Sequence, residues 1–510
     1  MGRNAIDFGH TWPSRHEFAR RAANERVVPV VRRLLADGMS AVGVYNGLCR
    51  GKPGTFLLES AESDGCWNRW SFVGVRARAC LLAEDNEAWW EGDVPAGLPT
   101  GGNISEVLAR TLAILRSSPV EGLPPLTCGL VGALGWDFVA SWEPQLASDK
   151  PREVDVPDVA LLLASDVVAL DHADGSVWII ANAINGNGLA SGVDAAYADA
   201  VARLDELEHA LAQMPRLALG SLGETPQLTV APRVSETEFC DVVERCKEHV
   251  AAGDVFQVVP SQRFDVESPA HPFDVYRTLR GLNPSPYMYL IHASARGREF
   301  SLVGASPETL MRLRGRELQT FPIAGSRPRG DTPTRDRELA EELAADEKER
   351  SEHLMLVDLA RNDVSKVCEP DSVAVSGFMD IVRYSHIMHL TSSVTGRVRE
   401  GIDAVSCLQA TFPAGTLSGA PKIKAIELIN AYEPARRGFY GGVIGHLDFT
   451  GDADVAIAIR TAVIVGARAH VQAGAGIVAD SRPRAEFEET IHKSQACVSA
   501  VRRAAALRSQ

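Results

Sequence analysis

The chain has 510 residues, 45% of them hydrophobic and 23% charged, and its formal net charge at pH 7 is −14. This composition is typical of a soluble globular protein, and the length exceeds what one hydrophobic core usually organises, so we expect two or three domains. The acidic balance argues against a nucleic-acid-binding protein, because such proteins engage phosphates through clustered Lys and Arg. A small anionic substrate remains compatible with it, since that ligand needs only a locally positive pocket.

Nine cysteines are scattered along the chain, and no two of them form a Cys-x-x-Cys pair. The odd count and wide spacing indicate reduced thiols in a cytoplasmic protein rather than a disulfide framework. The first residues are polar and lack the apolar core of a signal peptide, and no apolar run approaches the length of a membrane span. We therefore expect a cytoplasmic protein that binds neither membrane nor nucleic acid.

Short strand-like segments alternate with turns in the first part of the chain. Residues 55–60 are predicted to form a strand, and residues 159–170 and 177–181 are predicted to form a pair of buried strands. Glycines punctuate residues 129–137, which predicts a turn, and the segment lacks the Lys-Ser/Thr ending of a phosphate loop. A helix over residues 193–213 is expected to close this half.

A segment rich in Pro, Gly, Thr and Ser covers residues 214–233, and we interpret it as the connection between two halves. The predicted division is therefore an N-terminal part of residues 1–225 and a C-terminal part of residues 235–510. The second part begins with a strong helix signal, because Ser235 and Glu238 form a capping box ahead of an apolar stripe.

Helices and long strands alternate in the second half. Residues 335–359 contain neither Pro nor Gly and predict one helix-patterned run. Ser418 is a candidate N-cap for a helix over residues 423–429, residues 454–465 have the pattern of a strand, and residues 483–507 predict a terminal helix. Antiparallel-looking strands with helices inserted between them indicate the α+β class.

Two of the predicted helices each carry glutamates three residues apart, Glu349 with Glu352 and Glu486 with Glu489. Residues at this spacing share one helix face. If the two faces met, four carboxylates would repel one another unless a metal lay between them, and all-oxygen ligands favour Mg²⁺. Two independent solvated faces are the alternative. A di-iron site is disfavoured, because the helix-patterned run over residues 335–359 supplies no Glu-x-x-His to match the one at Glu489, and the pattern is not a four-helix bundle.

Several other residues are candidates for contact with an anionic ligand. Arg460 alternates with small residues in the predicted strand, which leaves room for a bidentate carboxylate, although an arginine at a sheet edge gives the same pattern. Gly474 and Gly476 mark either a bulge or a close approach of the backbone to a ligand. His389 is compatible both with a structural histidine and with an acid or base.

Eight motifs in order make the chain resemble the chorismate-utilising enzymes, and together they cover most of its length. The resemblance implies an α+β fold in which large antiparallel sheets form a sandwich surrounded by helices. It also implies a regulatory N-terminal part that intertwines with a chorismate-binding catalytic part. The motifs lie at residues 57–60, 253–259, 282–288, 305–308, 322–330, 352–363, 415–421 and 472–476.

The resemblance implies a Mg²⁺ cofactor and a set of substrate contacts. Glu352 and Glu489 would bind the ion directly, Glu349 and Glu486 would support it through water, and the ion would hold the ring carboxylate of chorismate. Arg460 would hold the enolpyruvyl carboxylate. Position 326 is serine where the family more usually has threonine, a change that keeps the hydroxyl. The residues that would grip the substrate are Gly325, Ser326, Tyr440, Arg460, Gly474, Ala475 and Gly476.

Catalytic roles follow from the same resemblance. Glu308 would be the general acid for the departing C4 hydroxyl, Thr416 would orient that hydroxyl, and His389 would assist the later loss of pyruvate. Relatives that add water carry a lysine base where this chain has Gln257, and relatives that form aminodeoxychorismate carry a nucleophilic lysine where it has Ala324. The remaining possibility is direct attack of ammonia at C2 of chorismate. This is the reaction of the anthranilate-forming branch.

The resemblance also implies partners and regulation. Ammonia would come from a separate glutamine amidotransferase subunit, and a dimer of such heterodimers is compatible with the family. One pocket built from both halves would let L-tryptophan bias their packing and inhibit the enzyme. The residues that resemble the tryptophan site are Glu59, Ser60, Asn283, Pro286, Tyr287 and Met288.

Two alternatives to the anthranilate-forming branch remain. The first is an aminodeoxychorismate-forming enzyme, against which Ala324 speaks. The second belongs to another class, a catalytically silent sensor of chorismate or tryptophan. A silent relative is expected to have lost a metal carboxylate, Glu308 or His389, and all of these are present.

Overall fold

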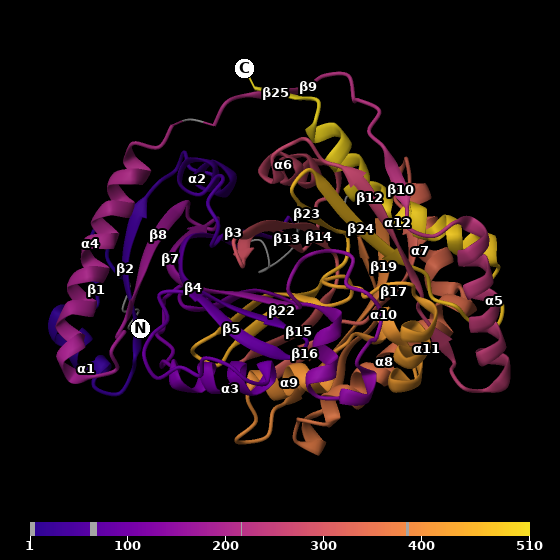
Figure 1. Ribbon diagram of the computed structural model, residues 1–510, viewed down its shortest axis with the longest axis horizontal. Helices are drawn as coiled ribbons and strands as arrows, with labels where there is room; N and C mark the ends of the chain where they lie inside the picture. The colour runs from indigo at the N-terminus through magenta and orange to yellow at the C-terminus, as the bar shows by residue number, and fades with distance from the viewer. Residues whose placement is uncertain (1–5, 62–68, 216, 384–386, 510) are drawn as a thin grey trace.

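The computed structural model describes residues 6–61, 69–215, 217–383 and 387–509. Its described strands include 21 that join in one sheet, and all pairings between its named strands are antiparallel. Helices surround this sheet, with α1 (Arg15–Ala22) and α4 (Val193–Ala212) on the N-terminal side and α12 (Pro483–Ala504) on the C-terminal side (Figure 1). The predicted α+β class with large antiparallel sheets is confirmed.

The remaining helices are α2 (Ala41–Leu48), α3 (Ile104–Ile114), α5 (Glu236–Ala252), α6 (Pro272–Leu282), α7 (Pro333–Ala345), α8 (Glu347–Ser365), α9 (Ala404–Thr411), α10 (Gly415–Ser418) and α11 (Lys422–Tyr432). The strands are β1 (Thr11–Trp12), β2 (Val27–Leu35), β3 (Thr55–Glu59), β4 (Trp70–Glu84), β5 (Glu87–Gly92), β6 (Gly129–Leu134), β7 (Val159–Asp171), β8 (Ser176–Ile184), β9 (Gly220–Leu222), β10 (Val230–Pro232), β11 (Gln257–Val258), β12 (Ser261–Glu267), β13 (Tyr287–Ala295), β14 (Arg298–Ser306), β15 (Thr309–Arg314), β16 (Glu317–Thr320), β17 (Ile323–Pro328), β18 (Ala374–Arg383), β19 (Ile387–Arg397), β20 (Gly419–Ala420), β21 (Val443–Asp448), β22 (Ala453–Ile457), β23 (Thr461–Val465), β24 (Arg468–Gly474) and β25 (Leu507–Ser509).

Strand β7 is the centre of the N-terminal part. It pairs with β4, β6 and β8, and every one of its residues is buried. A strand covered on both faces is mostly apolar rather than alternating, and the sequence of β7 accordingly consists of two apolar runs separated by Ser165 and Asp166. The predicted pair of buried strands is confirmed as β7 with β8, and the predicted helix over residues 193–213 is confirmed as α4.

The prediction of a turn over residues 129–137 is wrong. Residues Gly129–Leu134 form the buried strand β6, which pairs with β7 on one side and with β21 on the other. The glycines serve close packing here, because a Cβ on Gly132 would overlap the carbonyl oxygen of Ala160. Glycine in a strand marks such an approach as well as a turn, and the sequence does not distinguish the two.

Strand pairing crosses the predicted boundary between the two parts. Strand β3 of the first part pairs with β13 of the second, and β6 pairs with β21. The segment interpreted as a connection also contributes β10, which pairs with β12. Two sequence-distant parts therefore share one continuous hydrogen-bonded sheet. The division at residues 1–225 and 235–510 stays a prediction.

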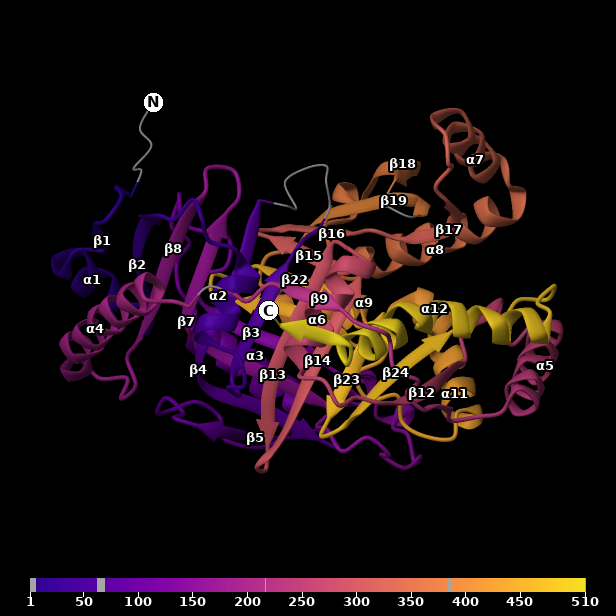
Figure 2. The same ribbon diagram turned by 90° about the horizontal axis from the view of Figure 1, so that it is seen from above.

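The helix predicted over residues 335–359 is two helices. Helix α7 ends at Ala345, and Asp346 begins α8 by accepting hydrogen bonds from the backbone N–H groups of Lys348 and Glu349, at 3.0 and 3.1 Å. An aspartate suits this N-cap position because its carboxylate satisfies the unpaired N–H groups of the first turn. Figure 2 shows α7, α8 and β17–β19 together at one end of the molecule.

Two further local predictions are wrong. Ser418 is not the N-cap of α11, because its hydroxyl donates to the carbonyl oxygen of Ala414 (2.9 Å) and Pro421 holds the cap position. Residues 454–465 are not one strand either. Strand β22 ends at Ile457, and β23 starts at Thr461 after Arg460 adopts a φ of 51°. A left-handed backbone at a non-glycine residue is uncommon and not visible in the alternation of side chains.

Three large apolar clusters and one small one form the core of the described residues, and the largest extends beneath both parts of the chain. None of the helices in the described ranges has the length and apolar content that a membrane crossing requires.

The close approach of β6 to β7 leads to a stability prediction. We expect Gly132→Ala to lower the free energy of unfolding by about 2 kcal/mol, because the added methyl group collides with the backbone of β7. Urea denaturation measures the change. Gly281→Ala is the matched control, since an added Cβ there meets no atom within 4 Å in helix α6. Equal stabilities for the two variants would contradict the prediction.

Candidate active site

A cavity of about 680 Å³ lies among the ends of the C-terminal strands, between α8 and α12. It brings together all the residues predicted for catalysis, substrate binding, metal binding and nucleophile selectivity except Ala475. Ala475 is fully buried beside the cavity and donates its backbone N–H to the carbonyl oxygen of Pro260 (3.1 Å). The predicted residues that line the cavity are Gln257, Glu308, Ala324, Gly325, Ser326, Glu349, Glu352, His389, Thr416, Tyr440, Arg460, Gly474, Gly476, Glu486 and Glu489.

Glu308 is held as a proton donor at the end of β14. Its backbone carbonyl accepts the N–H of Ile457 (2.9 Å), and its carboxyl Oε1 accepts the hydroxyl of Thr416 (2.9 Å). Burial raises the pKa of Glu308 to about 7, and the hydrogen bond from Thr416 only partly opposes this shift. A carboxyl group with a pKa near the working pH is suited to general acid catalysis.

His389 lies across the cavity on β19, opposite Ser326 in the ladder between β17 and β19. Its Nδ1–H donates to the carbonyl oxygen of Gly325 (3.1 Å), and burial lowers the pKa of the imidazole. The ring is therefore neutral near pH 7. Gly325 has a φ of +69°, and a Cβ there would lie 2.9 Å from Oε2 of Glu349, so this position requires glycine.

Arg460 and two glycines form another wall. The left-handed backbone of Arg460 is held by the N–H of Ala305, which donates to its carbonyl oxygen (3.1 Å). Among the described residues, no carboxylate forms an ion pair with the guanidinium, which leaves it available to an anionic ligand. A Cβ on Gly476 would lie 2.6 Å from Nε2 of Gln257, and one on Gly474 would lie 2.9 Å from the hydroxyl of Tyr440.

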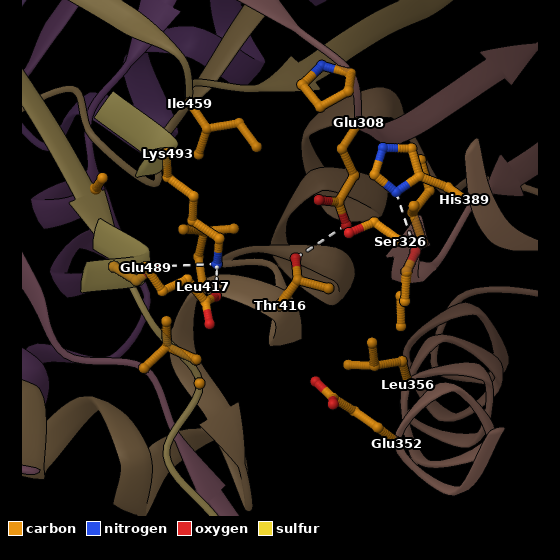
Figure 3. A pocket seen from close by; sticks show the side chains of 18 of the residues that line it. Glu308, Ser326, Glu352, Leu356, His389, Thr416, Leu417, Ile459, Glu489 and Lys493 are labelled. Carbon is orange, nitrogen blue, oxygen red and sulfur yellow. Dashed lines mark hydrogen bonds and ion pairs between the residues drawn. The ribbon is translucent and has the colours of Figure 1, made fainter. Parts of the chain in front are cut away.

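The four predicted metal-binding glutamates occupy facing walls. Figure 3 shows Glu352 on one side of the cavity and Glu489 on the other. Glu352 accepts a hydrogen bond from Nε2 of Gln257 (3.1 Å), and Glu489 pairs with Lys493 (2.6 Å). In the described part of the chain, no three acidic, His or Cys side chains are close enough to hold a metal ion together. The Mg²⁺ assignment stays a prediction.

The donor chemistry of this cavity nevertheless fits a hard divalent cation. Burial and the neighbouring Glu352 raise the pKa of Glu349, and burial together with Glu489 raises the pKa of Glu486, against the hydrogen bond from Ser481. Arg327 pairs with Glu349 (3.4 Å) and Lys493 with Glu489 (2.6 Å), whereas Glu352 and Glu486 form no ion pair among the described residues. Carboxylate oxygens facing one space are the ligand type that Mg²⁺ prefers.

Two lysines of the cavity have no role in the sequence-based assignment. Lys493 lies one turn after Glu489 and also donates to the carbonyl oxygen of Gly474 (3.1 Å). Lys348 directly precedes Glu349 and also lines the cavity. In the sequence, the i, i+4 spacing of Glu489 and Lys493 indicates that Lys493 lies on the same helix face as Glu489. The sequence holds no comparable signal for the second, because lysines are common on exposed helix faces.

The residues predicted to bind tryptophan gather at a separate place, and none of them lines the cavity. Glu59 is opposite Met288 in the ladder between β3 and β13. Its buried carboxylate accepts the hydroxyl of Tyr276 (2.6 Å) and Nε of Arg280 (3.0 Å). In the next ladder Tyr287 is opposite Ser306, two residues before the catalytic glutamate. The two segments therefore meet, and their ligand stays a prediction.

Comparison with known proteins agrees with this arrangement. The model of the chorismate binding enzyme family matches residues 61–499. Anthranilate synthase component 1 of Arthrobacter globiformis is 50% identical, over 98% of this chain and 95% of its own length. The same component of Mycolicibacterium smegmatis is 49% identical, over 97% and 94%. The crystal structure of anthranilate synthase component I from Streptococcus pneumoniae TIGR4 has a TM-score of 0.72 at 33% identity, covering 86% of this chain and 94% of that one.

A cavity with a buried acid, an available arginine and facing carboxylates, on a fold matched over nearly its whole length, defines a chorismate binding enzyme. The chain belongs to that family. Within it, the chain falls among the anthranilate synthase component 1 enzymes, to which it is about half identical from end to end. The sequence-based prediction of the anthranilate-forming branch is confirmed.

The raised pKa of Glu308 gives a measurable pH dependence of stability. The folded state binds this proton more tightly than the unfolded state, whose pKa is 4.5. The resulting stabilisation is therefore full below pH 4.5 and is lost as the pH rises through about 7. Relative to Glu308→Gln, which does not titrate, we expect the wild type to lose about 3 kcal/mol of unfolding free energy over this range.

Denaturant titrations of both proteins at several pH values measure this difference. Glu341→Gln changes an exposed glutamate and is expected to follow the wild type at every pH. A difference between wild type and Glu308→Gln that stays constant from acidic to neutral pH would show that Glu308 does not titrate there.

Proposed function

We propose that this chain converts chorismate and ammonia to anthranilate and pyruvate through aminodeoxyisochorismate, the first committed step of tryptophan biosynthesis. The observation that carries the proposal is the assembly of Glu308, Thr416, Arg460 and His389 around one cavity, with Gln257 and Ala324 where other branches have lysine. Neither a glutamine amide nor a methyl group can activate water or form a covalent adduct. Free ammonia is then the nucleophile.

In the first step, ammonia attacks C2 of chorismate, the ring double bonds shift, and the bond between C4 and its hydroxyl oxygen breaks. Glu308 supplies the proton that converts the departing hydroxyl to water, and Thr416 orients both partners through its hydroxyl. Hydroxide is a poor leaving group, so protonation at this oxygen lowers the barrier. Arg460 binds the enolpyruvyl carboxylate and keeps the ring in register with Glu308.

In the second step, the C2 proton is lost, the ether bond to the enolpyruvyl group breaks, and the ring becomes aromatic as pyruvate leaves. The neutral imidazole of His389 is suited to accept a proton at this stage. Glu352 and Glu489, supported by Glu349 and Glu486, would hold Mg²⁺, which supplies charge neutralisation for the ring carboxylate when bound. The remaining chemistry is that of the protein side chains.

Ammonia is supplied by a partner subunit in this proposal. The relatives are named as a component 1, which implies a second component. The one Gly-x-Cys-x-Gly sequence of the chain, Gly47 to Gly51 around Cys49, is unsuited to glutamine hydrolysis, because the thiol is fully buried at the end of α2 and burial raises its pKa to about 12. A separate glutamine amidotransferase subunit would therefore release ammonia for this chain, in a cytoplasmic complex for which an assembly of two heterodimers is one arrangement.

Anthranilate fluorescence tests the reaction directly. Purified protein with chorismate, Mg²⁺ and an ammonium salt at alkaline pH is expected to form anthranilate without a partner. We expect Glu352→Gln and Glu489→Gln to lower kcat about 10²-fold or more, because each removes a predicted metal ligand. Matched controls are Glu347→Gln on α8 and Glu488→Gln on α12, whose exposed side chains lie outside the cavity.

Two outcomes would contradict the proposal. A folded wild-type protein that forms no anthranilate would refute the reaction, and accumulation of aminodeoxychorismate instead would favour the sister branch. Full activity of Glu352→Gln and Glu489→Gln would refute the metal assignment while leaving the reaction in place.

The structure also supports a route for feedback inhibition by L-tryptophan. Strand β13 begins with Tyr287 and Met288, shortly after Asn283 and Pro286. It pairs with β3 on one side and with β14 on the other. Strand β14 ends two residues before Glu308. A ligand that changes the packing of β3 against β13 therefore acts on the strand that carries the catalytic acid.

Substitution at the end of β3 tests this regulation. We expect Ser60→Phe to raise the tryptophan concentration for half-inhibition about tenfold or more, with kcat nearly unchanged, because a large side chain would occupy the proposed tryptophan site beside Glu59. Inhibition curves with ammonia as the nitrogen source measure it. Ser118→Phe, at an exposed loop position, is the control. Unaltered inhibition in Ser60→Phe would place the effector site elsewhere.

A further inference from the structure

A buried ion pair lies directly behind the cavity. Arg437 and Glu433 leave only 1% and 6% of their side chains exposed, and neither lines the cavity. The guanidinium Nη2 is 2.6 Å from Oε1 of the carboxylate, and Nε is 3.0 Å from Oε2. Two charges in such a position are tolerated only when their remaining hydrogen-bonding groups are also satisfied. The partners of these remaining groups therefore indicate the role of the ion pair.

The remaining donors of Arg437 go to two segments that form walls of the cavity. Nη1 donates to the carbonyl oxygen of Leu417 (2.8 Å), the residue after Thr416. Nη2 also donates to the carbonyl oxygen of Val259 (2.6 Å), two residues after Gln257. Val259 in turn donates its N–H to the carbonyl oxygen of Ser418 (3.0 Å). The guanidinium of Arg437 thus holds the segment of Thr416, the hydrogen-bond partner of Glu308, against the segment of Gln257.

The carboxylate of Glu433 fixes a third segment. Its Oε1 accepts both the backbone N–H and the hydroxyl of Ser261, each at 2.8 Å. Ser261 is opposite Gly474 in the ladder between β12 and β24, and its hydroxyl also accepts Nε2 of Gln472 (2.8 Å). The strand that presents the cavity glycines is therefore tied to the same ion pair.

Aromatic rings complete the surroundings of Arg437. The guanidinium carbon is 4.2 Å from the ring centroid of Trp136 and 5.5 Å from that of Tyr440. Trp136 comes from the N-terminal part and is almost fully buried. Contacts of this kind combine packing with cation–π attraction. The N-terminal part thereby touches the group that supports Tyr440 in the cavity.

We infer that Arg437 and Glu433 are positioning residues for the reaction, holding Thr416, Gln257, Tyr440 and the glycine strand in one arrangement. The inference deepens the proposed function and rests on it. A purely stabilising role is the competing explanation. The two differ in their consequences, because a buried ion pair replaced on both sides by apolar residues of similar size commonly leaves stability unchanged or increased.

The experiment is the double variant Arg437→Met/Glu433→Leu, assayed with chorismate, Mg²⁺ and ammonium salt. We expect a melting temperature near that of the wild type and a kcat lowered about 10²-fold, with a smaller change in KM for chorismate, because misplaced groups slow chemistry more than binding. The control is Arg203→Met/Asp166→Leu, a buried pair between α4 and β7 that lies outside the cavity. Its kcat is expected to equal that of the wild type.

A kcat of the double variant within about twofold of the wild type would overturn the inference. If the double variant does not fold, the kcat of Arg437→Lys is measured in its place. Lysine keeps the charge opposite Glu433 but cannot reproduce the planar fork that reaches Val259 and Leu417. A folded Arg437→Lys protein with wild-type kcat would equally overturn it. Absence of anthranilate from the wild type, by contrast, counts against the proposed function itself.

Discussion

The site depends first on the register of β14 between β13 and β23. Gly304 is opposite Thr461, and the next N–H along β14, that of Ala305, donates to Arg460. These bonds set Arg460 and Glu308 at fixed places on two neighbouring chain segments. A slip of one residue would turn every side chain of β14 to the opposite face. The apolar cores on both faces of the sheet prevent such a slip, so packing far from the cavity fixes its geometry.

Charge in the cavity is distributed by the same scaffold. Burial raises the pKa of Glu308 to about 7, against the hydrogen bond from Thr416 and the charge of Lys493, whereas Glu489 forms an ion pair with Lys493. Carboxylates of one chemical type thus acquire different tasks from their surroundings. Burial lowers the pKa of His389 and so favours the neutral imidazole, whose Nδ1–H donates to the carbonyl oxygen of Gly325 and thereby fixes the tautomer. The proposed division between acid, base and metal ligands thus follows from burial rather than from residue type.

Much of this could be predicted from the sequence, and the failures have physical causes. Ordered motifs identified the family, and all the residues predicted for catalysis, substrate, metal and nucleophile selectivity except Ala475 line the cavity, because chemistry restricts which side chains work at each place. The break at Arg460 was missed because a single left-handed residue leaves the alternation of its neighbours intact. Strand β6 was missed because glycine serves close sheet packing as well as turns. Arg437 and Glu433 were missed since a pair on a loop becomes meaningful only through its backbone partners, which a sequence does not show.

The role of the N-terminal part follows from where it touches the rest of the molecule. The N-terminal part does not merely cover the cavity from outside. Its strands β3 and β6 belong to the same hydrogen-bonded sheet as the C-terminal strands β13 and β21. Trp136 follows β6 directly and packs on the guanidinium of Arg437, while Glu59 ends the strand that pairs with β13. The first part therefore reaches the cavity walls along two paths, one through β13 and β14 toward Glu308 and one through Trp136 and Arg437 to Tyr440. Because both paths are packed and hydrogen-bonded throughout, a change in how the two parts fit cannot leave the catalytic walls unaltered.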